Sequence, residues 1–184
     1  KHIAVVSYLE FRDKFLPEGC FSVHQARAFF PLFDSNNLTR WARKGMLIKL
    51  RQGWYAFPDL LQRPDFSRYV ACRIYRPSYI SLHTALSMYG MIPEAVTSIT
   101  SISTLKTARF ENKFGQYSYE NVKPELFFGD KPVELPINTA LINAPKLTWL
   151  LAQPEKALLD LLYLYPFYDN NTELEQLRLD EAYM

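Results

Sequence analysis

The sequence has few of the residues that build metal sites and disulfide frameworks. Its two cysteines, Cys20 and Cys72, lie far apart and lack the Cys-x-x-Cys spacing of a structural zinc site. We expect both to be buried free thiols in a protein of the reducing cytoplasm. The three histidines, His2, His24 and His83, are too scattered to form a metal site. We therefore expect no metal ion.

Long hydrophobic runs are also missing. No apolar stretch approaches the about 18 to 20 residues that cross a bilayer. The apolar start of the chain meets Glu10, Arg12 and Asp13 too early for a signal peptide. We therefore expect neither export nor a membrane segment. The sequence also contains no G-x-S-x-G motif, phosphate-binding glycine loop or dinucleotide-binding fingerprint. We expect a protein that is not an enzyme and has no cofactor.

The chain does contain enough apolar material for a folded protein. Of its 184 residues, 48% are hydrophobic and 15% are aromatic, which suffices for one sizeable core or two small ones. Residues 1–76 carry 13 Lys and Arg against 6 Asp and Glu, a balance of +7, whereas residues 77–184 carry 8 against 13, a balance of −5. Because phosphate attracts the first part and repels the second, a contact with nucleic acid should come from residues 1–76.

Two short helices are predicted near the N-terminus. Ala4, Tyr8, Phe11 and Phe15 recur at helical spacing, which predicts a helix that stops at residues 17–19. Residues 22–30 begin with the Ser-x-x-Gln pattern of a reciprocal capping box and end before a proline, which predicts a second helix.

The stretch SNNLTRWARKGMLIKL, residues 35–50, predicts a third helix with two different faces. Asp34 or Ser35 caps its start, and Gly45 stands where a left-handed residue ends a helix. The face that suits a core holds Leu38, Trp41 and Ala42. The other face carries only hydrogen-bond donors and charge, from Asn36, Thr39, Arg40 and Arg43.

Two apolar runs, residues 46–50 and 54–58, follow around a short turn that contains Gly53, which predicts a β-hairpin. Three short helices followed by a hairpin is the order of a winged helix-turn-helix, in which the third helix enters the major groove of DNA. We therefore predict a winged helix-turn-helix domain with a connector over residues 1–76, whose partner is double-stranded DNA.

The polar face of the third helix and the hairpin then supply the DNA contacts. Asn36, Asn37 and Thr39 can reach base edges, and Arg40 can bind a guanine bidentately or a phosphate. The full set of predicted DNA-binding residues is Ser35, Asn36, Asn37, Thr39, Arg40, Arg43, Lys44, Lys49, Arg51 and Gln52. The alternative is an ordinary solvated helix face. Trp41 is better explained as a core anchor than as a base-stacking residue.

Residues 77–184 predict a second domain. A helix from residue 82 to 89, capped by Ser81, precedes five short β-type segments that we expect to form a mostly antiparallel sheet. These segments are residues 96–102, 107–111, 116–122, 125–129 and 138–144. Pro154 and Glu155 open another helix, and residues 171–184 predict a last, polar one. The predicted fold class is therefore α+β, a winged helix-turn-helix followed by an α+β domain.

Two sets of residues in this domain resemble catalytic groups. Glu155, Lys156 and Asp160 suggest a metal-dependent nuclease, but they lie on one predicted helix, so Lys156 and Asp160 are more simply a surface ion pair. His83 near Glu94 or Asp160 could imitate an acid–base pair, for which a structural role is the simpler interpretation.

Three separated blocks of the sequence resemble the AbiEi antitoxin family, the predicted transcriptional regulators of viral defence systems. The blocks are SNNLTRWARKGMLIKLRQGWYAFP, RPSYISLHTALSMYGMIPE and PEKALLDLLY, within residues 20–165. The resemblance implies a bacterial type IV toxin–antitoxin system. In it the chain represses its own operon and counteracts a nucleotidyltransferase-like toxin, and residues 77–184 form the AbiEi-like antitoxin or regulatory domain.

Other classes of function remain open from the residues alone. The chain could be a solitary winged-helix regulator whose C-terminal domain binds a protein or a ligand, the ligand lying among Tyr79, His83, Tyr89 and the sheet aromatics. A winged helix can also serve only as a protein-binding surface. If the chain represses by binding as a two-fold dimer, its operator should be an inverted repeat.

Overall fold

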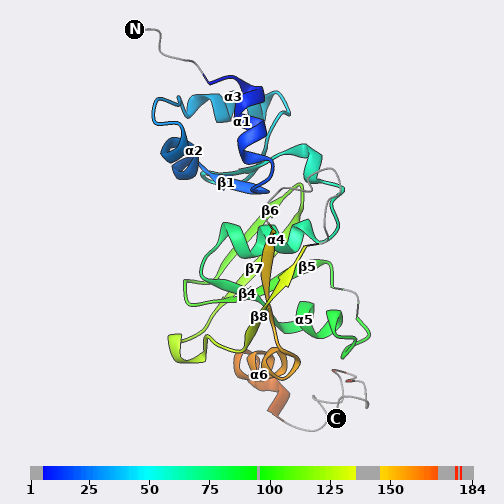
Figure 1. The fold of residues 1–184 in the computed structure, drawn as a ribbon. Helices are drawn as coiled ribbons and strands as arrows, with labels where there is room; N and C mark the ends of the chain where they lie inside the picture. Colours follow the sequence, from blue (N-terminus) through cyan, green and yellow to red (C-terminus); the bar gives the residue numbers. More distant parts are fainter. Residues whose placement is uncertain (1–5, 95, 136–145, 170–176, 178, 180–184) are drawn as a thin grey trace.

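Two β-sheets, each with its own helices, organise the chain (Figure 1). The structure is a computed structural model that describes residues 6–94, 96–135, 146–169, 177 and 179. Its elements in chain order are α1 (Tyr8–Phe15), β1 (Cys20–Ser22), α2 (Val23–Phe29), α3 (Asn36–Arg43), β2 (Ile48–Arg51), β3 (Trp54–Ala56), η1 (Pro58–Leu60), α4 (Phe66–Ile74), β4 (Ser78–Ile80), α5 (Leu82–Met88), β5 (Ser98–Ser103), β6 (Ala108–Asn112), β7 (Gly115–Asn121), η2 (Pro124–Leu126), β8 (Asp130–Glu134), β9 (Thr148–Ala152), α6 (Pro154–Leu164) and η4 (Pro166–Asp169).

The smaller sheet belongs to residues 6–57, here called the N-terminal unit. Its strand order is β1-β3-β2, and both pairings are antiparallel. Local signals in the sequence set its helices. The Ser7 hydroxyl accepts from the Glu10 amide (3.2 Å) at the start of α1, and Ser22 and Gln25 form the predicted capping box at the start of α2.

Aromatic side chains fill the core of the N-terminal unit. The Phe11 ring is fully buried and lies 4.9 Å from the Phe33 ring and 5.2 Å from the Phe21 ring, centroid to centroid. Trp41 of α3 joins the same cluster, 5.1 Å from Phe11 and 5.3 Å from Tyr8. The prediction that Trp41 is a core anchor is therefore confirmed. Such ring contacts hold three short helices on a sheet of only three strands.

The larger sheet organises the remaining described residues, here called the C-terminal unit. Its order is β6-β7-β5-β4-β9-β8, with β5/β7 and β4/β9 parallel and the other pairs antiparallel. Taken together, the two sheets are mostly antiparallel, so the predicted α+β class is confirmed at this level. Tyr119 donates to Ala71 of α4 (2.7 Å), whereas Tyr79 donates to Asp160 of α6 (3.1 Å). The sheet register places Tyr79 and Tyr119 on opposite faces, so α4 and α6 cover opposite faces.

The two units contact each other directly. Arg51 Nη1 donates to the Ile74 carbonyl (2.7 Å), and the Asn112 side chain donates to the Leu50 carbonyl (3.1 Å). The Tyr69 hydroxyl of α4 donates to the Glu18 carbonyl in the α1–β1 turn (2.9 Å). Hairpin β2–β3 thus lies between the core of the N-terminal unit and the C-terminal unit.

Several expected elements differ from the structure. Residues 125–129 form no strand, because they begin with the 3₁₀ turn η2 and the strand starts only at β8. Strands β1, β4, β8 and β9 were not predicted. Residues 138–144 and 171–184, the predicted strand and last helix, fall on segments outside the described residues, apart from Leu177 and Leu179. Among the described residues, none of the helices has the length and apolar character required to span a bilayer.

Candidate nucleic-acid interface

Helix α3 is fixed to the N-terminal unit by one side and by both of its ends. Leu38 is fully buried, and Trp41 packs in the aromatic cluster. At the start, the Asp34 carboxylate accepts from the Asn36 amide (2.9 Å), whereas Ser35 occupies the N-cap position without a side-chain cap bond. At the end, Gly45 has a φ of +73°, the left-handed conformation expected there. The outward side chains therefore project from a rigid element.

The outward face of α3 presents the predicted polar residues to solvent. Asn36, Thr39, Arg40, Arg43 and the C-cap Lys44 are all exposed. Asn37 is half-buried and accepts a hydrogen bond from Arg40 Nη2, which holds the Arg40 guanidinium against the helix surface.

A basic residue absent from the predicted set lies beside this face. Arg27, exposed at the last turn of α2, donates from Nη2 to the Ser35 hydroxyl (2.8 Å). Ser35 is thereby half-buried and its hydroxyl is occupied in the free protein. Arg27 reaches α3 because of the conformation of the α2–α3 connection. The spacing of residues in the sequence does not predict this contact.

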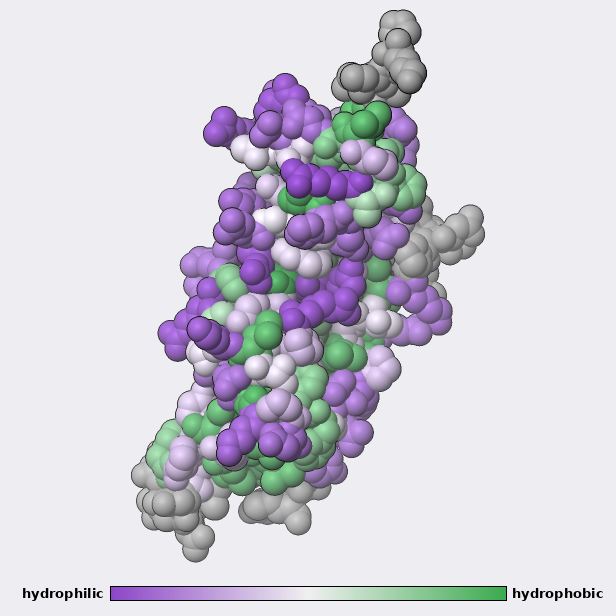
Figure 2. Space-filling model, turned by 90° about the vertical axis from the view of Figure 1, so that its left-hand side faces the viewer, coloured by the Kyte–Doolittle hydropathy of each residue, from purple (hydrophilic) through white to green (hydrophobic). Residues whose placement is uncertain are grey.

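Apart from Asp34 at the start of α3, the charged residues of this helix and of the hairpin that follows are all basic. Residues 35–58 include five Lys and Arg but no Asp or Glu. The acidic Asp59 that follows is held by Arg12, with Nη2 2.5 Å from Oδ1. Figure 2 views the molecule from the side on which α2 lies in Figure 1. Hydrophilic residues cover most of the upper end in this view, next to one hydrophobic area.

The three predicted DNA-binding residues of the hairpin differ in their exposure to solvent. Lys49 and Gln52 are exposed. Arg51 is half-buried, donates to the Ile74 carbonyl, and places its guanidinium 4.8 Å from the Phe110 ring and 5.6 Å from the Tyr75 ring. Its observed contacts are thus with the C-terminal unit. Both rings offer the guanidinium a cation–π contact.

The prediction of a surface ion pair between Lys156 and Asp160 is wrong. Both side chains are buried, with 6% and 2% of their surface exposed. Lys156 Nζ donates to Asp160 Oδ1, and the Ser81 (2.7 Å) and Tyr79 (3.1 Å) hydroxyls donate to Oδ2. Lys156 can be buried because Gly129 lies against its stem, where a Cβ atom would come within 2.9 Å of Lys156 Cγ. The Ser81 hydroxyl therefore binds the Asp160 carboxylate and makes no side-chain cap bond at the start of α5, where a cap was expected.

Among the described residues, the metal-dependent nuclease arrangement considered from the sequence is not assembled around this pair. The Asp160 oxygens are occupied by internal donors, and the described part of the chain contains no group of three His, Cys, Asp or Glu side chains able to hold a metal ion. His83 is half-buried, which lowers its pKa, an effect that the nearby Glu94 carboxylate opposes.

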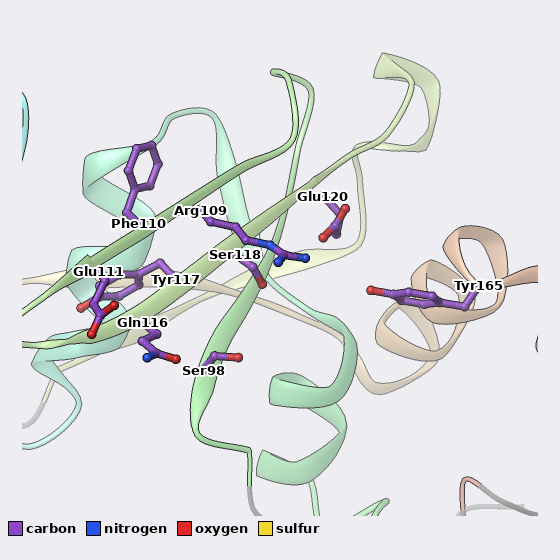
Figure 3. Close-up of a pocket in the computed structure, with 9 residues that line it drawn as sticks. All are labelled: Ser98, Arg109, Phe110, Glu111, Gln116, Tyr117, Ser118, Glu120 and Tyr165. Atoms are coloured by element: carbon purple, nitrogen blue, oxygen red, sulfur yellow. The ribbon is translucent and has the colours of Figure 1, made fainter.

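Tyr79, His83 and Tyr89, among which a ligand pocket was expected, do not line the hollows described for the C-terminal unit. Tyr79 is fully buried, and the Tyr89 hydroxyl donates to the Ala152 carbonyl (2.8 Å). An open hollow of about 570 Å³ lies instead on the exposed side of β5, β6 and β7 (Figure 3). There Arg109 and Glu120 point toward Ser118, and the Tyr165 hydroxyl points toward them from beyond α6. Burial, and then Glu120, raises the pKa of Tyr165, so this phenol stays protonated at neutral pH.

Comparison with known proteins adds no family to these observations. A scan against protein-family models finds no match, and a search of curated proteins finds no significant relative. The candidate interface is therefore described by its own residues, a polar and basic helix face on an aromatic core.

Proposed function

We propose that the N-terminal unit is a winged helix-turn-helix that binds double-stranded DNA through α3, and that the chain is a transcriptional regulator. One observation carries this proposal: α3 holds an exposed, acid-free face of Asn, Thr and Arg side chains on a rigid aromatic core. The element order α1-β1-α2-α3-β2-β3 supports it. In this proposal α2 and α3 are the two helices of the helix-turn-helix, whose second helix lies in the major groove, and the hairpin β2–β3 is the wing.

The proposed roles follow from chemistry and exposure. Asn36 and Thr39 face solvent and read base edges, and Arg40 binds a guanine through its two parallel donors. Arg43, Lys44 and Lys49 neutralise phosphates, and Gln52 hydrogen-bonds the backbone. Asn37 and Ser35 hold Arg40 and Arg27 in place in the free protein. For Arg51 we propose contact with phosphate only if its bond to Ile74 opens.

The mechanism of regulation would be steric. A domain that occupies a major groove within a promoter excludes RNA polymerase from the same DNA. The affinity for phosphate brings the domain to DNA of any sequence, and the base contacts of α3 select the operator. We propose that this operator lies upstream of the gene itself.

The wider proposal is that the chain is the antitoxin of a type IV, AbiE-like toxin–antitoxin system. It rests on the three sequence blocks described above, which resemble the AbiEi family. In this proposal the C-terminal unit counteracts a nucleotidyltransferase-like toxin in the bacterial cytoplasm. The alternative is a solitary regulator whose C-terminal unit binds a ligand, which the open hollow on β5, β6 and β7 favours.

A promoter–reporter fusion tests the regulatory proposal. The upstream region of the gene drives a reporter in cells that express the wild-type chain or Arg40→Ala. We expect repression by the wild type and its loss in the variant. Lys123→Ala, which removes an exposed cation of the C-terminal unit, is the matched control and should repress normally. Equal expression with and without the wild-type chain would refute the proposal.

A further inference from the structure

The second hollow of the C-terminal unit holds chemistry that the proposed function does not use. It has a volume of about 470 Å³ and lies where the first residues of β4 and β9 meet the end of α4. Phe127, Trp149 and Leu150 give it an apolar wall. Its polar side includes Arg73, Arg76 and Ser78.

Three of the residues that line this hollow each have a polar side-chain atom with no hydrogen-bond partner within the part of the chain that the structure describes. These atoms are Trp149 Nε1, Ser78 Oγ and Arg73 Nε, and all three are buried. Trp149 is 1% exposed and Ser78 3% exposed. A buried donor without a partner destabilises the folded state, so such groups are rare unless something else satisfies them. An indole and a guanidinium can only donate, so the missing partner must offer acceptor atoms.

The charged residues that line the hollow are both cationic. Arg73 and Arg76 both line it, and no Asp or Glu does so among the described residues. Burial raises the pKa of the Cys72 thiol, which also lines the hollow, to about 11. The thiol is therefore uncharged at neutral pH and adds no negative charge.

We propose that this hollow binds a small organic anion, whose carboxylate accepts from the Trp149 indole, the Ser78 hydroxyl and the Arg76 guanidinium. Its apolar body lies against Phe127 and Leu150. A planar carboxylate matches the fork of a guanidinium, and the volume falls in the range of roughly 300 to 1,000 Å³ found for small-molecule sites. The proposal concerns ligand binding by the C-terminal unit and does not depend on DNA binding.

The test follows the indole N–H signals of the three tryptophans in ¹H–¹⁵N spectra of the whole chain. The chain is titrated with sodium benzoate, with inorganic phosphate and with sodium chloride at matched ionic strength. We expect benzoate to produce a saturable shift of the Trp149 signal and to leave the Trp41 signal in place. Trp149→Phe assigns the signal; if that variant does not fold, Trp41→Phe and Trp54→Phe assign it by elimination.

Two variants test whether the benzoate-induced shift of the Trp149 signal arises from binding in this hollow. Arg76→Gln should weaken benzoate binding by about tenfold, the loss expected for one charge-assisted hydrogen bond. Lys113→Gln, in the exposed turn between β6 and β7 and several strands away from β9, should leave the affinity unchanged. A Trp149 signal that responds to phosphate but not to benzoate would overturn the proposal of an organic anion. A response to sodium chloride alone, or none at all, would overturn the site.

Discussion

Arg40 and Arg43 lie one helical turn apart on α3, and both are exposed, yet we propose different roles for them. Arg40 is held by Asn37 and can approach base edges as a planar donor pair. Arg43 is near the end of the helix, beside Lys44, where its charge serves a phosphate.

The first prediction separates these roles. Arg40→Ala should weaken binding to the operator by about 1 to 3 kcal/mol and relax the sequence preference at one base pair. Arg43→Ala should weaken binding to all sequences alike and reduce the salt dependence by about one counterion. Titration of both variants against specific and scrambled duplexes measures this. Unchanged specificity in Arg40→Ala would contradict the base-reading role.

The second prediction concerns the buried ion pair. Lys156→Met leaves the Asp160 carboxylate buried without its cation, so the free energy of unfolding should fall by about 3 to 5 kcal/mol. The exposed pair Lys146–Glu134, with N···O of 3.0 Å, is the matched control. Lys146→Met should change stability by no more than about 1 kcal/mol. Urea unfolding of both variants compares them, and equal losses would mean that burial of Lys156 does not matter.

At the scale of elements, the turn between α1 and β1 is a point of close contact between the units. Gly19 has a φ of +76°, and a Cβ atom there would lie 2.9 Å from Leu147 Cδ1 and 2.9 Å from Tyr69 Cε1. Gly45 at the end of α3 has a similar φ of +73° but no atom within 4 Å of the same position. A substitution at Gly45 therefore tests backbone strain alone, whereas one at Gly19 tests the same strain together with a steric clash of the added side chain.

The third prediction uses this difference. Gly45→Ala should cost about 1 to 2 kcal/mol of stability, the strain of a left-handed residue with a side chain. Gly19→Ala should cost about 1 to 3 kcal/mol more, because the added methyl group also displaces packed side chains. Thermal and urea unfolding of the two variants give the comparison. A loss at Gly19 no larger than at Gly45 would show that the contact between the units yields easily.

Elements with strong local signals could be predicted from the sequence. The capping box at Ser22 fixes α2, the hairpin follows its glycine turn, and Pro154 opens α6 as expected. The short strands β4 and β9 could not be predicted, because three to five residues show little period and their pairing joins segments far apart in the chain.

The same limit applies to the candidate sites. The exposed face of α3 could be predicted because helical spacing alone decides which residues share it. Helical spacing also brings Lys156 and Asp160 together, but it does not reveal Gly129 and the strand that cover them. The hollow at Trp149 is formed by residues from three separate segments, 72–78, 127 and 148–150, so no local sequence pattern predicts it.

On the scale of the whole molecule, hairpin β2–β3 both borders the candidate interface and contacts the C-terminal unit. Lys49 faces solvent, whereas Arg51 faces Ile74, Tyr75 and Phe110. Arg73 of α4 in turn lies 5.9 Å from the Trp54 ring. The position of the N-terminal unit therefore depends on contacts that Arg51 makes.

The fourth prediction is that Arg51 joins the two units. Arg51→Gln should lower the free energy of unfolding by about 1 to 3 kcal/mol, the cost of losing a hydrogen bond that involves a charged group. The salt dependence of DNA binding should remain as in the wild type. Calorimetry and binding at several salt concentrations measure both quantities. A salt dependence reduced by about one counterion, with stability unchanged, would instead assign Arg51 to a phosphate.

The most direct test of the central claim is the affinity of the purified chain for its own upstream DNA and for a scrambled duplex, measured at two salt concentrations. We predict a preference for the upstream DNA and a slope of log affinity against log salt of about −2.7 or steeper, because Arg43, Lys44 and Lys49 would each neutralise one phosphate and each contribute about −0.9. Equal affinity for both duplexes, or no binding, would contradict it. That result would leave α3 as a solvated helix and move the function to the C-terminal unit.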